Sequence, residues 1–227
     1  MTGIRARARL ETTARIKQLA REQIALKGAA GLSLREIARE LGMASSALYR
    51  YFDSRDQLLT ALIVESYDEV GELIEHADAR CRRDDLLGRW KSVTTALRGW
   101  AIEHPSDYGL LFGTPVPGYE APADTNVPGQ RYTTVLMGIV ADAHAAGRIA
   151  DVEIPAGRAI AREYKKVRKN LSLEVPDEFL LAGLAAWAAM LGAISLEIFG
   201  HVDMVLEDPG VHFDSLTTML GTRLLGL

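Results

Sequence analysis

The sequence has almost no cysteine and no recognisable catalytic motif. Cys81 is the only cysteine of the 227 residues, which excludes a disulfide framework and a thiolate metal cluster. The chain contains no G-x-S-x-G elbow, no H-E-x-x-H pair, no Walker loop and no dinucleotide-binding fingerprint. The histidines are scattered, and a single pair such as His201 and Asp203 is weak support for a metal site. We therefore expect no catalytic residue, no metal, no cofactor and no enzyme activity.

Secretion signals and β-strand patterns are also missing. The N-terminal arginines are not followed by an apolar stretch, so we expect no secretory signal and a cytoplasmic protein. No internal repeat or low-complexity segment stands out, and most apolar residues recur with a helical period. With 48% hydrophobic residues, the chain can bury one sizeable core beside a small N-terminal module. These features predict an all-α fold.

The negative charge of the chain is unevenly distributed. The net charge is −4, but residues 1–60 hold 11 Lys and Arg against 6 Asp and Glu, whereas the remainder holds 15 against 24. A basic N-terminal module on an acidic body is expected when only one end of a protein contacts nucleic acid. Arg5, Arg7 and Arg9 alternate at the N-terminus, where they form either a flexible arm on DNA or a disordered, solvated segment.

The segment from Leu32 to Ile63 has the pattern of a helix-turn-helix. Ser33 and Glu36 form a capping box, and the following apolar residues have helical spacing, namely Leu34, Ile37, Ala38 and Leu41. Gly42 follows directly, where a left-handed residue ends a helix at least cost. The pattern predicts a short helix and then a tight turn of about three residues.

A second short helix follows this turn, and Ser45 or Ser46 is suited to cap it. Its spacing turns one set of residues inward, namely Ala44, Ala47, Leu48, Tyr51 and Phe52. The outward set is small, hydroxylated, aromatic and cationic, namely Ser45, Ser46, Tyr49 and Arg50. Such a face fits a major groove, where Arg50 can pair with guanine. A solvated helix face is the alternative, but the turn and the caps favour the groove.

A third helix begins after Asp53 or Ser54, either of which can cap it, and Arg55 lies in its first turn. A helix N-terminus beside a cation attracts anions. Next to a recognition helix, such a site would hold a DNA phosphate and fix the docking register without distinguishing bases.

Residues 10–63 resemble the DNA-binding domain of the tetracycline-repressor (TetR) family. The matching motifs are the apolar helix from Ile16 to Leu26, the SLREIA-like segment, the LG turn, the LYRYF recognition helix and Arg55. The resemblance implies base or groove contacts from Arg35, Ser45, Ser46, Ala47 and Arg50, and phosphate contacts from Ser33, Tyr49, Tyr51 and Arg55. It implies a DNA-binding domain over 9–69. Ser46 and Ala47 depart from the usual family residues, so no operator sequence follows.

The rest of the chain is expected to be helical. We expect helices to about Asp78, over 86–104, over about 129–146, and over 177–200 and 209–225. Pro105 should end the second of these, and the proline-rich segment 112–129 should be irregular. The basic stretch 162–170 is expected to be a solvated surface, with a second DNA contact as the alternative.

The stretch Phe179 to Leu196 contains 18 residues without a charge. It nearly satisfies the length criterion for a membrane span. However, it is rich in alanine and glycine, stands alone and lacks flanking lysines. A soluble protein also buries a helix that is apolar on all sides. We therefore expect a core helix that also forms a subunit interface, with no membrane partner.

The C-terminal part is similar to the WHG-type domain of one branch of TetR regulators. Its pattern is matched by Trp187, Gly192, Leu196, Glu197 and Gly200, and Leu191 stands where histidine would complete the signature. The resemblance implies an effector-binding and dimerisation domain over 70–227, in which the last two long helices pair with those of a second subunit. Small residues would permit close approach there, namely Ala182, Gly183, Ala186, Ala189 and Gly192.

The sequence thus predicts a DNA-binding transcriptional regulator with an N-terminal helix-turn-helix and a helical effector domain. We expect a homodimeric repressor that binds a palindromic double-stranded operator and is released by a small-molecule effector of unknown identity. Aromatic residues with polar tips and their neighbours are candidates to line the effector pocket, namely Trp100, His104, Tyr108, Phe112, Tyr132, Met137 and Trp187. The alternatives are a membrane-associated helical protein that uses the 179–196 run and an enzyme with an unrecognised site.

Overall fold

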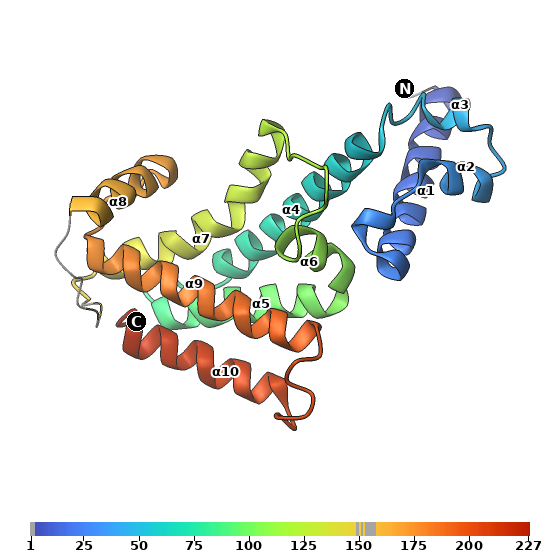
Figure 1. Cartoon of the computed structure of the whole chain (residues 1–227). Coiled ribbons are helices and arrows are strands. Elements are labelled where there is room, and N and C mark those ends of the chain that lie inside the picture. The colour runs from blue at the N-terminus through green and yellow to red at the C-terminus, as the bar shows by residue number, and fades with distance from the viewer. Residues whose placement is uncertain (1–2, 149, 151, 153–157) are drawn as a thin grey trace. The chain divides into compact units, whose positions relative to one another are not determined.

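The computed structural model describes residues 3–148, 150, 152 and 158–227. Within these ranges every regular element is a helix and no strand occurs, which confirms the predicted all-α class (Figure 1). The chain divides into two compact units. The first contains the residues up to Tyr67 together with His104–Asn126, and the second contains Asp68–Glu103 with Val127–Leu227. This division by packing places an internal segment with the N-terminal unit, unlike the simple division at residue 69 expected from the sequence.

The first unit contains α1 (Ile4–Lys27), the short turn η1 (Ala29–Gly31), α2 (Leu34–Glu40), α3 (Ser45–Leu48), the start of α4 (Arg55–Ala79) and α6 (Pro105–Phe112). Its core is formed by apolar residues of the first helices, among them Ile16, Ile37, Leu48 and Leu58, which have no exposed surface. Arg5, Arg7 and Arg9 lie within α1, so the expectation of a flexible or disordered arm is wrong. The segment consists of strong helix formers, which explains the early start of this helix.

α2 begins as predicted, but only half of the capping box forms. Ser33 Oγ accepts a hydrogen bond from the backbone N–H of Glu36 at 3.4 Å. The return bond is missing because the N–H of Ser33 donates to Gln23 Oε1 in α1 at 3.0 Å. The carboxylate of Glu36 instead accepts from Lys27 Nζ at 2.6 Å. The N–H of Ser33 and the carboxylate of Glu36 thus both have partners in α1, and these two bonds connect α1 to α2.

The turn after α2 and the short α3 determine how the outward face is presented. Gly42 adopts a φ of 63°, in the left-handed region that glycine occupies without strain. α3 begins at Ser45 with Ala44 as its N-cap, and no side chain caps it, so the predicted serine cap is wrong. Ala44 is exposed rather than packed inward. Tight turns continue α3, since the N–H of Tyr51 donates to the carbonyl of Leu48 at 2.8 Å.

α4 carries the expected cap. Ser54 Oγ accepts from the N–H of Gln57 at 3.0 Å, and Gln57 Oε1 accepts from the N–H of Asp53 at 2.6 Å. This reciprocal pair satisfies two N–H groups that would otherwise lack partners at a helix start. The choice between Asp53 and Ser54 is thereby resolved in favour of Ser54.

α6 was not predicted. Pro105 ends the preceding helix but also occupies the first position of α6, where the missing proline N–H costs nothing. Within the first unit, Asp107 of α6 accepts from Arg21 Nε at 3.1 Å and from Ser66 Oγ at 3.0 Å. These bonds fasten α6 to α1 and to the adjacent part of α4. The segment after α6 is irregular as expected, apart from a short turn, η2, at Ala123–Thr125.

The second unit contains the remainder of α4, α5 (Leu86–Glu103), α7 (Asn126–Ala145), α8 (Arg158–Leu171), α9 (Asp177–Ile198), α10 (Pro209–Met219) and the π-helical turn η3 (Leu220–Leu224). α9 packs against α5, α8 and α10. The indole N–H of Trp90 in α5 donates to the carbonyl of Thr217 in α10 at 2.8 Å. The predicted helices over 86–104 and 177–200 are confirmed to within two residues, and α7 begins three residues earlier than expected.

α9 is the uncharged helix. Among the described residues it alone is long and apolar enough to cross a membrane, judged by length and composition. One side of α9 is buried in the second unit, where Leu180, Met190 and Ile194 have no exposed surface. Gly183 permits close packing, because a Cβ there would lie 3.0 Å from the sulfur of Met137 in α7. This side of α9 therefore belongs to the core of the second unit, as the sequence predicted.

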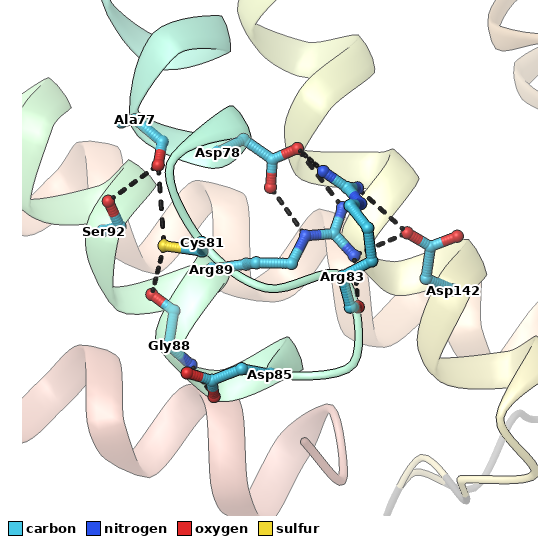
Figure 2. A network of polar contacts seen from close by, with 9 residues as sticks. All are labelled: Ala77, Asp78, Cys81, Arg83, Asp85, Gly88, Arg89, Ser92 and Asp142. Atoms are coloured by element: carbon cyan, nitrogen blue, oxygen red, sulfur yellow. Dashed lines mark hydrogen bonds and ion pairs between the residues drawn. The ribbon is translucent and has the colours of Figure 1, made fainter.

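An ion-pair network whose centre, Arg89 and Asp78, is buried joins three helices of the second unit (Figure 2). Arg89 of α5 donates from Nε to Asp78 of α4 at 2.7 Å and from Nη1 to Asp142 of α7 at 2.6 Å. Arg83, in the α4–α5 connection, donates to the other oxygen of Asp78 at 2.6 Å. Burial opposes ionisation of Asp78, but the hydrogen bonds from Arg89 and Arg83 outweigh it and hold the pKa of this carboxyl below its usual value. Cys81 lies beside this network with its thiol near the carbonyls of Ala77 and Gly88.

Candidate nucleic-acid interface

The outward face of α3 and the turn after it consists of exposed side chains, namely Ser45, Ser46, Tyr49 and Arg50. Leu48, on the opposite side, has no exposed surface. Ala47 and Tyr51 are partly buried and lie at the borders of the exposed face. The two serines are short, so the backbone at the start of α3 can approach base edges closely, while Arg50 reaches further. The chemistry of this face suits a major groove.

A shallow pocket of about 420 Å³ adjoins this face. It is lined by residues from the start of α2, the end of the α3 segment and the start of α4, namely Ser33, Leu34, Arg35, Tyr49, Asp53, Ser54 and Arg55. The structure thus brings four of the predicted contact residues to one place, although they come from three separate elements. Hydroxyl, guanidinium and backbone N–H donors predominate, which suits a phosphate group. Asp53 is the one carboxylate in the lining.

The guanidinium group of Arg55 already has partners within its own chain. Its Nη2 donates to the carbonyl of Ala29 at 3.0 Å, and its Nη1 lies 3.7 Å from a carboxylate oxygen of Asp56. Its Nε is buried and has no hydrogen-bond partner among the described residues. Arg55 therefore supports η1 as well as lining the pocket.

Arg9, predicted from the sequence to lie in an N-terminal arm, instead contacts the end of the recognition segment. Its Nη2 donates to the carbonyl of Arg50 at 3.1 Å, and its guanidinium carbon lies 5.2 Å from the ring centroid of Tyr51. The arginine thereby satisfies a carbonyl at the end of the recognition segment and stacks on a residue predicted to contact phosphate. The 41-residue separation from Arg50 left no local sequence signal for this contact.

The predicted effector residues fall into two groups. His104, Tyr108 and Phe112 belong to the first unit, whereas the others belong to the second, namely Trp100, Tyr132, Met137 and Trp187. In the first unit, the rings of Tyr108 and Phe112 lie 5.0 Å apart, and Tyr67 meets Phe112 edge-on at 6.3 Å. Tyr67 was not predicted. Helical spacing does not distinguish an aromatic residue buried in the core from one that lines a pocket. The sequence therefore could not indicate which of these residues line a pocket.

In the second unit, two of the predicted effector residues line the same pocket. Met137 and Trp187 line it together with Thr133, Leu136, Leu171 and Leu184, and its volume is about 120 Å³. Trp100 and Tyr132 are each 4% exposed and are not part of this lining. Within the first unit, a second pocket of about 360 Å³ lies between α4, α6 and the segment that follows α6. Both pockets could accept a small molecule.

The predicted dimer residues lie on two sides of α9. Ala182 and Ala186 have no exposed surface, and Gly183 is buried against Met137, so these three pack within the unit. Ala189 is partly buried, and Gly192 is exposed with open space where a Cβ would be. Gly192 lies on an exposed face without charge, formed by Ala185, Ala188, Gly192, Leu196 and Phe199. A pocket of about 240 Å³ borders this face between α9 and α10.

Comparison with known proteins agrees with this geometry. The family model described as "Bacterial regulatory proteins, tetR family" matches residues 16–62. The model described as "Tetracyclin repressor-like, C-terminal domain" matches residues 90–220. The chain is similar to the HTH-type transcriptional regulator Rv1816 of Mycobacterium tuberculosis, with 40% identity across 96% of this chain and 94% of that protein. HTH-type transcriptional regulator Mb1846 of Mycobacterium bovis shows the same identity and coverage.

Solved structures give the same result. The crystal structure of the regulatory protein SCO4313 is 36% identical, with a TM-score of 0.77, over 94% of this chain and 97% of that chain. The TetR-family transcriptional regulator PfmR from Thermus thermophilus is 16% identical, with a TM-score of 0.62, over 92% of this chain and 98% of that chain. The second likeness concerns the fold alone.

Proposed function

The chain belongs to the tetracycline-repressor (TetR) family of DNA-binding transcriptional regulators, and from this premise we propose that it is a cytoplasmic, homodimeric repressor that a small-molecule effector releases from a palindromic operator. The observation that carries this proposal is the exposed face of Ser45, Ser46, Tyr49 and Arg50, next to a pocket that contains Arg35 and Arg55. Groove contacts and phosphate contacts are thus available side by side.

The residues divide into two roles. Those on or near the outward face of α3 contact base edges or the groove, namely Ser45, Ser46, Ala47 and Arg50, and Arg35 in the adjoining pocket does so as well. Those around the adjoining pocket and at the end of the recognition segment hold phosphates, namely Ser33, Tyr49, Tyr51 and Arg55. The division is supported by exposure, since Arg50 projects from the face while Arg55 lines the pocket. Base contacts specify the sequence, and phosphate contacts fix the register.

A second copy of the chain covers the uncharged face of α9. A soluble monomer seldom leaves a continuous apolar helix face in water. Leu196 is 47% exposed and Phe199 is 49% exposed, and no charged residue interrupts the face from Ala185 to Phe199. A two-fold axis would pair this face with itself, which also positions two recognition segments for the two halves of a palindrome.

The effector acts by favouring a shape that does not fit the operator. A ligand shifts such an equilibrium only through its differential affinity for the two shapes. Of the seven predicted pocket residues, Met137 and Trp187 line the pocket of the second unit, which is the more apolar in its lining residues. His104, Tyr108 and Phe112 are not in the lining of the first-unit pocket. Occupation of the pocket in the second unit would restrain α7, α8 and α9, whereas occupation of the other pocket would restrain α4 and α6 within the first unit.

The test of this proposal is titration of the full-length chain with the DNA upstream of its own coding sequence. We expect a specific complex that scrambled DNA does not compete away, and weaker binding of the operator after substitution of Arg50 by alanine. Arg82→Ala is the matched control, because Arg82 is an exposed arginine of the second unit that pairs only with Asp84 among the described residues. Equal affinity for specific and scrambled DNA, or equal effects of the two substitutions, would contradict the proposal.

A further inference from the structure

The pocket of the first unit is large enough for a ligand of two rings. It lies between α4, α6 and the segment that follows α6, and its volume is about 360 Å³. An apolar cavity of about 150 Å³ is sufficient for benzene in a well-studied protein. The first-unit pocket exceeds twice that volume, so two fused six-membered rings fit in it without displacing its walls. All of its lining residues belong to the first unit.

Two other pockets are less suited to a ligand of this size. The pocket that contains Met137 and Trp187 has a volume of about 120 Å³, which is smaller than the cavity that holds benzene. The pocket of about 240 Å³ between α9 and α10 contains Glu197 and His212, and it borders the face that we propose a second copy covers. Size and surroundings therefore favour the pocket of the first unit.

The lining of the first-unit pocket restricts the charge of its ligand. No charged residue lines it. Its helical walls consist of Ile63 and Tyr67 from α4 and of Leu110 and Leu111 from α6, so they are apolar apart from one tyrosine hydroxyl. An ionised group placed against these walls would lose hydration without gaining a counter-charge. The walls therefore favour a neutral molecule with an apolar body.

The remaining polar side chains lie on the other side of the pocket. Thr114, Thr125 and Asn126 come from the segment after α6 and from its end at α7. The hydroxyl of Thr125 donates to the carbonyl of Pro122 at 2.8 Å, so its proton is already used. Thr114 and Asn126 are exposed to solvent. A single polar substituent on the ligand can therefore stay near water and these two side chains while the rings lie against α4 and α6.

The wall formed by the segment after α6 also contacts the core of the DNA-binding module. Val116 and Tyr119 line the pocket and pack against the core cluster that contains Ile37 of α2 and Leu48 of α3. The hydroxyl of Tyr119 lies 3.0 Å from Thr60 Oγ1 of α4. A ligand that moves this wall would therefore change the packing against the helices that present the recognition face.

We infer that the first-unit pocket binds a neutral molecule of two-ring size, whose apolar rings lie against α4 and α6, and that this is the chemical class of the effector. The inference rests on the proposed function, because it names the class and the binding site of the ligand that releases the operator. Lack of charge distinguishes this class from aromatic acids, and size distinguishes it from single-ring compounds.

The experiment is calorimetric titration of the full-length protein, without DNA and at neutral pH, with three compounds. The first, 2-naphthol, is neutral and has two rings; phenol keeps the hydroxyl but has one ring, and 2-naphthoate keeps two rings but carries a charge. We expect phenol to bind roughly tenfold more weakly than 2-naphthol, because it buries less apolar surface. We expect 2-naphthoate to bind at least about tenfold more weakly, because its charge must be desolvated. No binding of 2-naphthol, or equal affinity for either of the other compounds, would overturn the inference.

Two substitutions in the lining test the location. Leu111→Ala removes part of the apolar wall, and Ala121→Phe adds a ring at an exposed position of the lining, so each should weaken the binding of 2-naphthol roughly fivefold or more. The matched controls lie outside the lining. Leu26→Ala is in α1 at a side chain that is 83% exposed, and Ala145→Phe is at an exposed position of α7.

Both controls should bind 2-naphthol like the wild type. Unchanged affinity in both lining variants, or an equal loss in the controls, would overturn the location. Thermal melting shows whether each variant is folded. If one lining variant fails to fold, the other still decides the location, and the comparison of the three compounds uses the wild type alone.

The outcomes also separate this inference from the proposed function. If 2-naphthol binds as expected but saturation with it leaves operator binding unchanged, the pocket stands and release by this ligand class is wrong. If another compound releases the operator from the wild type and from both lining variants alike, while 2-naphthol does not bind, the repressor mechanism stands and the pocket assignment is wrong.

Discussion

Arg89 Nε donates to Asp78 Oδ1 at 2.7 Å, and this bond joins α5 to α4 with the arginine side chain only 2% exposed. A buried pair of this kind is costly to break from one side, because the remaining charge loses its counter-charge without regaining water. We expect Asp78→Ala to lower the free energy of unfolding by about 3 kcal/mol, the low end of the usual range, since Asp142 still pairs with Arg89. Urea denaturation measures this. Asp84→Ala is the control because its carboxylate is exposed, and an equally large loss there would contradict the assignment to burial.

The same contact predicts a dependence of stability on acid. Burial raises the pKa of Asp78, but the hydrogen bonds from Arg89 and Arg83 lower it further, so its pKa in the folded protein lies below the ordinary value of 3.8. A carboxyl with a depressed folded pKa contributes stability above its unfolded pKa and loses it as the pH falls through the folded value. Between neutral pH and the region below pH 3.8, the wild type should therefore lose more stability than Asp78→Asn. Parallel pH profiles of the two proteins would contradict this linkage.

Arg50 and Arg55 should differ in their effects on DNA binding. Arg50→Ala should weaken binding to the operator by roughly 1–3 kcal/mol and relax the preference at one base pair in each half-site. Arg55→Ala should weaken operator and scrambled DNA about equally and reduce the salt dependence, because it removes a phosphate contact. Titrations on both DNAs at two salt concentrations measure this.

Arg55 has a second effect that Arg50 lacks. Because Arg55 also donates to the carbonyl of Ala29, Arg55→Ala should lower the melting temperature, whereas Arg50→Ala should leave it nearly unchanged. If the two variants lose affinity in the same way on both DNAs, the division between base and phosphate contacts is wrong.

Local patterns in the sequence predicted the elements whose ends depend on neighbouring residues. Ser33 and Gly42 mark the ends of α2, and the apolar spacing from Leu86 defined α5. The sequence predicted that Pro105 ends α5, but it did not predict that the same residue begins α6. Local patterns could not predict the contact of Arg9, because the carbonyl to which this arginine donates belongs to Arg50, 41 residues further along the chain.

The orientation of α9 shows a different limit. A helix with a polar stripe reveals its outward face, but α9 has apolar residues on every side between Phe179 and Leu196. The sequence therefore indicated small residues that allow close packing without indicating what packs against them. The structure turns Ala182, Gly183 and Ala186 toward α9's own unit and leaves Gly192 outside. The partner of each small residue depends on tertiary packing that periodicity does not encode.

One variant on each side of α9 tests the dimer, because Gly183 is buried and Gly192 is exposed. Gly183→Ala should reduce stability modestly, because the new Cβ would lie 3.0 Å from Met137 Sδ and 3.3 Å from Val140 Cγ2, but it should leave the subunit assembly intact. Gly192 has open space around it, so Gly192→Glu should fold normally as a monomer. Thermal melting and light scattering on both variants measure these effects.

Gly192→Glu should act through the subunit interface. A symmetric interface repeats each residue, so the substitution places two carboxylates near the two-fold axis without counter-charges. The loss of the dimer would uncouple two recognition segments that must lie roughly 34–36 Å apart to engage successive major grooves, and tight operator binding should vanish while weak nonspecific binding survives.

Ala145→Glu, at an exposed position of α7, is the control for the added charge and should remain dimeric. A Gly192→Glu protein that stays dimeric and binds the operator normally would exclude this face as the interface, and a wild type that is monomeric at micromolar concentration would refute the dimer itself.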